Sequence, residues 1–196
     1  MILEGIVTSL NTTGSLNIAP MGPVVETDNN KTLLLRPFQS STTFHNLSQQ
    51  RCGVFHVVDN VLLIARAAIN IWESPPETFA ANQIKGEVLK DSCRWLEFEV
   101  DQIDTSHQRS EMIVRVIHTE RLRDFFGLNR AKHLVLEAII LATRVHLLPQ
   151  EKIETALEMY RTPIEKTAGE NEQLAFSLIE SYLQAYWSKQ KNGVET

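Results

Sequence analysis

The stretch LLLRPFQSSTTFHNLSQQRCGVFHVV, residues 33–58, decides the fold of this chain. It begins with an apolar run, Leu33–Leu35, which is typical of a buried strand. Pro37 then removes a backbone N–H donor and biases Arg36 away from helical torsion angles. We therefore expect the strand to end at Arg36 and a different element to begin beyond it.

A short helix is predicted just after this strand. Ser40 or Ser41 can act as its N-cap, and Phe44 and Leu47 are spaced to form its inward face. Backbone N–H groups in a first helical turn have no partners within the helix, and the helix dipole favours an anion there. The start of this helix is therefore a candidate anion site.

The same helix start combines a cation with four consecutive hydroxyl side chains. Arg36 would lie at the end of the preceding strand, close to Ser40, Ser41, Thr42 and Thr43. Together these residues predict a cradle for a phosphate group. The alternative is a capped loop in which Arg36 pairs with a nearby carboxylate, because Ser and Thr favour such caps on their own.

A hairpin is predicted before this stretch. Glu4–Leu10 is typical of a strand, residues 11–14 of a turn, and Ser15–Val25 of a returning strand that contains Pro20 and Pro23. Because proline is poorly tolerated in a fully paired strand, residues 20–23 should form a sheet edge or a bulge. Such a place leaves main-chain groups free to meet a ligand.

Three motifs in this order carry a family resemblance: Asn17-Ile18-Ala19-Pro20, Thr43-Phe44-His45-Asn46-Leu47 and Gly53-Val54-Phe55-His56-Val57-Val58. The chain resembles the FMN-binding split-barrel superfamily, which includes flavin reductases and pyridoxamine phosphate oxidase-like proteins. The barrel resemblance covers roughly residues 1–121. The whole chain resembles an uncharacterised subfamily in which a helical segment follows the barrel.

The resemblance implies an FMN phosphate held near Arg36 and residues 40–43, with the isoalloxazine ring along residues 17–22. The cofactor-binding residues that it implies are Asn17, Pro20, Met21, Gly22, Arg36, Ser40, Ser41, Thr42, Thr43 and Asn46. The chain reads Phe-His-Val-Val-Asp at residues 55–59, where the superfamily often has an Asn. The resemblance therefore does not assign the residues that contact the edge of the isoalloxazine ring, and it does not decide whether the site is redox-active.

The function implied by the resemblance is that of a flavin-dependent oxidoreductase of unknown substrate. The superfamily also implies an obligate homodimer with the flavin at the interface between two barrels. Two alternatives remain: a non-catalytic carrier of a flavin or a deazaflavin, and a cofactor-free protein-interaction module. No catalytic residue is assigned, and the sequence shows no metal-ligand spacing.

The predicted fold class is α+β and mainly β, with a change of pattern near Arg121. Beyond the hairpin, the predicted strands are Lys31–Leu35, Gly53–Val57, Val61–Ala67, Asn82–Leu89, Arg94–Ile103 and Met112–Thr119. Several short strands in series predict a closed or nearly closed antiparallel barrel. The resemblance implies that this barrel is a split barrel of the flavin reductase type. We expect residues 1–121 to form this split barrel and residues 122–196 to form a helical extension packed on it.

The extension should contain three helices, because its apolar residues recur at steps of three and four. They are predicted over Asn129–Leu147, from Pro149 onward, and over Glu170–Lys189, with Thr162-Pro163 and Gly169 marking the last connection.

Composition is that of an ordinary globular chain: 196 residues, 43% hydrophobic and 22% charged. The net charge of −5 disfavours binding to nucleic acid or to an anionic membrane surface. Cys52 and Cys93 are not in a zinc or disulfide pattern. No apolar segment is long enough to cross a bilayer, so we expect a cytoplasmic protein.

Four other side chains have two interpretations each. His45 and His56 could reach a ligand, or they could be half-buried residues whose hydrogen bonds are satisfied within the protein. Arg66 and Arg144 could face the ligand cleft, or they could pair with a carboxylate.

Overall fold

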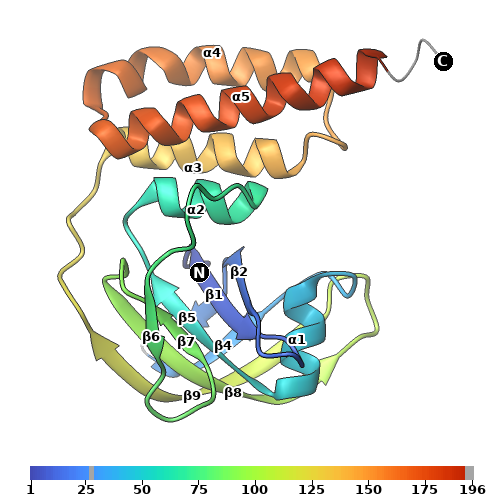
Figure 1. Cartoon of the computed structure of the whole chain (residues 1–196), viewed down its shortest axis with the longest axis vertical. Coiled ribbons are helices and arrows are strands. Elements are labelled where there is room, and N and C mark those ends of the chain that lie inside the picture. The colour runs from blue at the N-terminus through green and yellow to red at the C-terminus, as the bar shows by residue number, and fades with distance from the viewer. Residues whose placement is uncertain (27–28, 193–196) are drawn as a thin grey trace. The chain divides into compact units, whose positions relative to one another are not determined.

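The computed structural model describes residues 1–26 and 29–192 (Figure 1). The chain forms two compact units. The barrel unit contains residues 1–58 and 74–125, and the helical unit contains residues 59–73 and the chain from residue 126 onward. Along the sequence, the first part of the helical unit thus lies between the two segments that form the barrel unit.

The barrel unit contains a seven-stranded antiparallel sheet in the order β2-β1-β5-β8-β9-β4-β3. Its strands are β1 (Gly5–Leu10), β2 (Leu16–Met21), β3 (Val24–Glu26), β4 (Asn29–Leu35), β5 (Cys52–Val57), β8 (Arg94–Asp104) and β9 (Glu111–Arg121). A bridge between Ile2 and Val24 links the segment before β1 to the edge strand β3. The sheet therefore curls into the predicted split barrel, and this prediction is confirmed.

The interior of the barrel is filled by apolar side chains from both long and short strands. Phe55 of β5 and Phe98 of β8 are fully buried, as are Leu35 of β4 and Met112 of β9. The helix α1 (Thr42–Gln50) adds Leu47 to the same cluster. Burial of these large side chains supplies the main driving force for closing the sheet.

A small second sheet lies in the connection between β5 and β8. It pairs β6 (Thr78–Ala80) with β7 (Glu87–Leu89). The sequence predicted a single strand over Asn82–Leu89, which is wrong for residues 82–86. This segment is a loop whose backbone N–H groups at Asn82 and Gln83 bind the side chain of Glu97 instead of a neighbouring strand.

Pro20 occupies a sheet edge, as predicted, but the single returning strand expected over Ser15–Val25 is wrong: β2 ends at Met21, Pro23 lies between strands, and β3 begins at Val24 at the other edge of the sheet. Pro20 lies in β2 opposite Ile6, and β2 is the outermost strand on that side of the sheet. The missing N–H of Pro20 therefore costs no ladder hydrogen bond with a further strand.

The helical unit contains α2 (Val61–Ile69), α3 (Arg130–Thr143), α4 (Gln150–Thr167) and α5 (Glu170–Asn192). Within this unit, α3 packs against the other three helices, and α2 also packs against α5. Figure 1 shows α3, α4 and α5 running side by side. The three predicted helices of the extension are confirmed. Among the described residues, no helix combines the length and the apolarity needed to cross a membrane.

The prediction of a strand over Val61–Ala67 is wrong, because these residues form α2. A continuous apolar run fits a buried helix as well as a buried strand, so periodicity alone does not separate the two. The deciding signals are local: the Asn60 side chain caps the N-terminus by accepting from the N–H groups of Leu62 and Leu63, and Asn70 ends the helix in a left-handed conformation.

Pro163 does not interrupt the helical chain, contrary to the prediction that Thr162-Pro163 marks a connection. It lies inside α4, which continues to Thr167. Ile164, the next residue, is buried within the helical unit, and its packing offsets the loss of one backbone hydrogen bond. The connection between α4 and α5 is confined to Ala168 and Gly169.

Candidate functional site

The predicted anion site lies where α1 begins. Ser41 is the N-cap: its Oγ accepts from the N–H of Phe44 at 3.1 Å and donates to the carbonyl oxygen of Phe38 at 2.7 Å. The Ser41 hydroxyl is thus used by the cap itself. No acidic residue lies in the first turn of α1, so the partial positive charge of this helix end is not neutralised locally.

Several donors remain available at this helix start. The side chains of Ser40 and Thr42 are exposed, and within the part of the chain that the structure describes neither hydroxyl has a protein partner. The same holds for the backbone N–H groups of Thr42 and Thr43. These groups are of the kind that bind a phosphate at a helix N-terminus.

Arg36 is placed beside a carboxylate, as in the alternative interpretation of the sequence. Its Nε lies 3.2 Å from Oε1 of Glu111, and both side chains are about half exposed. This contact uses Nε, so the two terminal nitrogens of the guanidinium keep their donors. A role of Arg36 in holding a phosphate stays a prediction.

Arg109 is a second cation near this segment, and sequence reasoning missed it. Its backbone pairs with Phe38 as an isolated bridge, and its guanidinium carbon lies 4.3 Å from the centre of the Phe38 ring. The Gln39 side chain donates to the carbonyl oxygens of Thr105 and His107, which ties the β8–β9 loop to the approach to α1. Nothing in the local sequence signals this contact, because about 70 residues separate its two sides.

Three of the predicted site residues meet Ser9 in a polar cluster between the first hairpin and α1. The Asn17 Nδ2 lies 3.3 Å from Ser9 Oγ and 3.0 Å from Thr43 Oγ1. The Asn46 Nδ2 lies 3.1 Å from the same Ser9 oxygen. Ser9, Thr43 and Asn46 are almost completely buried.

Pro20, Met21 and Gly22 lie at the end of β2 and just beyond it. The first two are half-buried. A Cβ on Gly22 would lie 2.7 Å from Ile2 Cγ2 and 3.2 Å from the carboxylate oxygens of Glu4. A larger residue here would require the side chain of Ile2 to shift. No described hydrogen bond links these residues to α1.

His56 is a structural residue. It is fully buried in β5, where its Nδ1 lies 3.2 Å from the carbonyl oxygen of Ile6 and its Nε2 accepts from the N–H of Leu89 at 3.0 Å. Burial lowers the pKa of His56 to about 4, although the Ile6 carbonyl acts in the opposite direction. Both ring nitrogens are thus used within the barrel unit.

The other three side chains with two interpretations, those of His45, Arg66 and Arg144, lie at the surface of their units. His45 is exposed on α1 and contacts the Phe44 ring edge-on. Arg66 of α2 pairs with Glu73 at 2.9 Å, as in the carboxylate-pairing interpretation. Arg144 is exposed at the C-terminal end of α3, with no side-chain partner among residues 1–26 and 29–192.

Glu97 is a buried carboxylate that sequence reasoning did not single out. It accepts from the backbone N–H groups of Asn82 and Gln83 at 2.7 and 2.6 Å, and from the indole N–H of Trp95 at 3.1 Å. Burial alone would raise the pKa of Glu97, but these hydrogen bonds and nearby His118 hold it below its usual range. This carboxylate therefore stays ionised and fixes the loop at residues 82–83.

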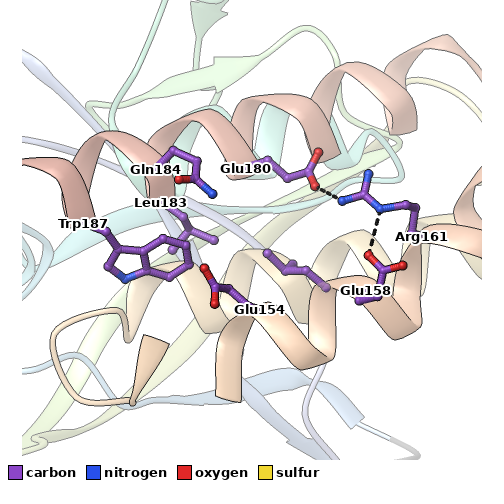
Figure 2. Close-up of a pocket in the computed structure, with 8 residues that line it drawn as sticks. Glu154, Glu158, Arg161, Glu180, Leu183, Gln184 and Trp187 are labelled. Atoms are coloured by element: carbon purple, nitrogen blue, oxygen red, sulfur yellow. Dashed lines mark hydrogen bonds and ion pairs between the residues drawn. The ribbon is translucent and has the colours of Figure 1, made fainter. Parts of the chain in front are cut away.

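A groove of about 160 Å³ is lined by residues of α4 and α5, and Figure 2 shows these side chains. Its lining includes Leu183, Trp187 and Arg161, and Arg161 contacts Glu180 at 2.6 Å and Glu158 at 3.2 Å. Glu154 adds a further carboxylate to the lining. Because carboxylates outnumber cations here, the groove does not suit a phosphate. Within the described residues, no group of three or more His, Cys, Asp or Glu side chains is arranged to hold a metal ion.

Structural comparison places the fold among flavoproteins. An FMN-bound protein from Methanosarcina mazei, MM1853 of the DUF447 family, matches with a TM-score of 0.78 and 25% identity over 92% of this chain and 94% of that one. The styrene monooxygenase flavin reductase of Pseudomonas putida S12 matches with a TM-score of 0.51 and 14% identity, covering 61% of this chain and 80% of that one. An FMN-binding protein from Thermus thermophilus matches with a TM-score of 0.54 and 11% identity, covering 64% and 75%. At these identities the last two show the fold alone.

A comparison with curated protein sequences gave no match. Two family models match the chain, and together they span most of it. The model for the N-terminal domain of DUF447, a protein of unknown function, matches residues 3–123, and the model for the C-terminal part of DUF447 matches residues 129–181. With both models in order along one chain, and with the split barrel shared with MM1853, this protein belongs to the DUF447 family.

Proposed function

We propose that this chain binds FMN through its barrel unit and acts as a flavin-dependent oxidoreductase. The observation that carries the proposal is the likeness to the FMN-bound protein MM1853, which extends over 92% of this chain. The fold shared with a flavin reductase supports the same class of protein.

The start of α1 fits the phosphate of such a cofactor. The backbone N–H groups of Thr42 and Thr43 and the exposed hydroxyls of Ser40 and Thr42 are donors without protein partners in the described parts of the chain. Arg36, the residue directly after β4, supplies a positive charge near this segment. When bound, the flavin supplies the hydride chemistry, and these residues bind and orient its phosphate.

We also propose a homodimer with the flavin between two barrels. This proposal rests on the resemblance to the split-barrel superfamily, in which the flavin lies at that interface. Analytical ultracentrifugation should show a particle of twice the chain mass of 22.3 kDa. A stable monomer that binds FMN would reject the dimer and keep the cofactor proposal.

An absorption spectrum of the purified protein, before and after addition of FMN, tests cofactor binding. We expect flavin absorbance that stays with the protein through gel filtration. Addition of NADH or NADPH with an external acceptor then tests turnover. Bleaching of the colour, followed by its return on transfer to the acceptor, supports an oxidoreductase, whereas a bound flavin that no donor reduces favours a carrier of a flavin or a deazaflavin.

A charge introduced in the first turn of α1 separates phosphate binding from folding. Thr42→Glu places a carboxylate where the helix dipole favours it, so the helix should not be weakened. The same carboxylate repels a phosphate, and we expect FMN to bind at least about tenfold more weakly. Gln49→Glu, near the other end of α1, is the matched control and should leave FMN affinity unchanged. Equal affinities in both variants would show that the phosphate lies elsewhere.

A further inference from the structure

The side chains that hold α1 against the first hairpin are mostly polar. Ser9 and Asn17 are direct partners across the β1–β2 ladder, so their side chains lie on the same face of the sheet. Thr43 and Asn46 are three residues apart on α1 and therefore share one face of the helix. The Asn17 amide joins the two elements by contacting both Ser9 Oγ and Thr43 Oγ1.

These contacts fix where the first turn of α1 lies. Only one apolar residue of α1, Leu47, is fully buried, and Phe44 is partly buried. Apolar contacts are not directional, so a short helix with one buried anchor could slide or rotate on the sheet. Ser9, Thr43 and Asn46 are buried polar groups that must keep a partner, because leaving one unpaired costs free energy, and the partly buried Asn17 supplies the partner of Thr43. The hydrogen bonds of Asn17 and Asn46 therefore select one position of α1.

We infer that Asn17 is a positioning residue for phosphate binding: through Thr43 it holds the first turn of α1 in place, and it does not contact the flavin ring itself. This inference rests on the proposed binding of FMN. It changes the role that the resemblance implies for residue 17, which is a place along the isoalloxazine ring. Thr43 would then have two roles: its side chain accepts from Asn17, and its backbone N–H, which has no protein partner among the described residues, is available to an anion.

The test compares two ligands that differ only in the phosphate. FMN and riboflavin share the ring and the ribityl chain, so a residue that acts through α1 should affect only FMN. We expect Asn17→Ala to weaken FMN binding by about tenfold and to change riboflavin binding by less than about twofold. Both affinities can be measured by quenching of flavin fluorescence with the full-length protein.

Ser48→Ala is the matched control on the same helix. The Ser48 Oγ is a buried side-chain atom that has no hydrogen-bond partner among the described residues. Its removal loses no hydrogen bond, so both affinities should stay as in the wild type. Thr43→Val removes the acceptor of the Asn17 bond, and the double variant Asn17→Ala/Thr43→Val should bind FMN about as well as the weaker single variant.

Two results would overturn the inference. If Asn17→Ala weakened riboflavin and FMN by the same factor, Asn17 would contact the ring, and if neither affinity changed, it would have no role in binding. Hydrogen exchange without ligand gives an independent readout: the amides of Thr43 and Phe44 should exchange faster in Asn17→Ala than in Ser48→Ala. A wild-type protein that binds neither ligand rejects the proposed function, and the exchange rates then still decide whether Asn17 positions the helix.

Discussion

His56 shows how a side chain that resembles a ligand in the sequence can be a structural part of the barrel. Its ring is fully buried, and both nitrogens are used, by the Ile6 carbonyl oxygen and the Leu89 N–H. This arrangement requires the neutral imidazole, because a protonated Nε2 would face the Leu89 N–H as a second donor. Acid should therefore weaken the barrel at this residue.

The pH dependence of stability has a defined sign. Burial lowers the pKa of His56 from 6.5 to about 4, so between these values the unfolded chain binds a proton that the folded chain does not. The neutral His56 therefore contributes to the free energy of unfolding, and this contribution is fully present above pH 6.5. It is lost as the pH falls toward 4, and the whole loss amounts to about 3 kcal/mol. Urea unfolding at pH 7 and pH 4.5 measures it. His56→Gln should show a smaller difference between the two pH values, and an equal difference would contradict this account.

Glu97 supports a loop through its charge. Glu97→Gln keeps the shape of the side chain but replaces one of the two acceptor oxygens by an amide NH₂, so one of the backbone N–H groups of Asn82 and Gln83 loses its acceptor. We expect a loss of about 2 kcal/mol in the free energy of unfolding, measured by chemical denaturation. Glu99→Gln on the same strand is the control: its half-exposed pair with Arg115 should be worth less than about 1 kcal/mol. Equal losses would show that the buried hydrogen bonds of Glu97 have no special weight.

At the scale of elements, the packing of α1 on the sheet depends on Gly53 of β5. A Cβ at this residue would lie 2.8 Å from Phe98 Cζ, 2.9 Å from Leu47 Cδ2 and 3.1 Å from the Thr8 carbonyl oxygen. Gly53→Ala should therefore push Leu47 away and destabilise the barrel unit by about 1–3 kcal/mol. Thermal unfolding measures the change. Gly86→Ala is the control, because its nearest contact is the flexible end of Ile84 at 3.3 Å, and a larger loss there would contradict the packing argument.

Elements with local signals could be predicted from the sequence. The start of α1 was predictable because Pro37, the Ser40-Ser41 pair and the apolar spacing after them all act within about ten residues. The helix α2 was not, because an unbroken apolar run has no period and its identity depends on packing against α3 and α5. The caps Asn60 and Asn70 were the available signal.

The candidate site could be predicted only in part, because its geometry is set by distant contacts. The hydroxyl-rich helix start is a local feature. The pairing of Arg36 with Glu111 and the stacking of Arg109 on Phe38 join segments about 70 residues apart, and no pattern in either segment encodes them. The link from Asn17 to Thr43 likewise spans 26 residues and depends on how α1 packs on the hairpin.

At the scale of the whole molecule, the helical unit draws on two separate parts of the chain. The buried apolar residues of α2 are Val61, Leu62, Leu63, Ile64, Ala65 and Ala67. A chain that ends at residue 125 keeps α2 but loses the helices that cover it within this unit. We expect this fragment to bind a hydrophobic dye and to aggregate, whereas a chain that ends at residue 192 should behave as the full length. A soluble fragment without dye binding would contradict the assignment of α2 to the helical unit.

The central claim is that the first turn of α1 holds the phosphate of FMN. A crystal structure of the protein grown with FMN tests it most directly. The account predicts phosphate oxygens within about 3 Å of the backbone nitrogens of Thr42 and Thr43. A bound FMN whose phosphate lies away from α1, or the absence of FMN from the barrel at saturating concentration, would contradict it.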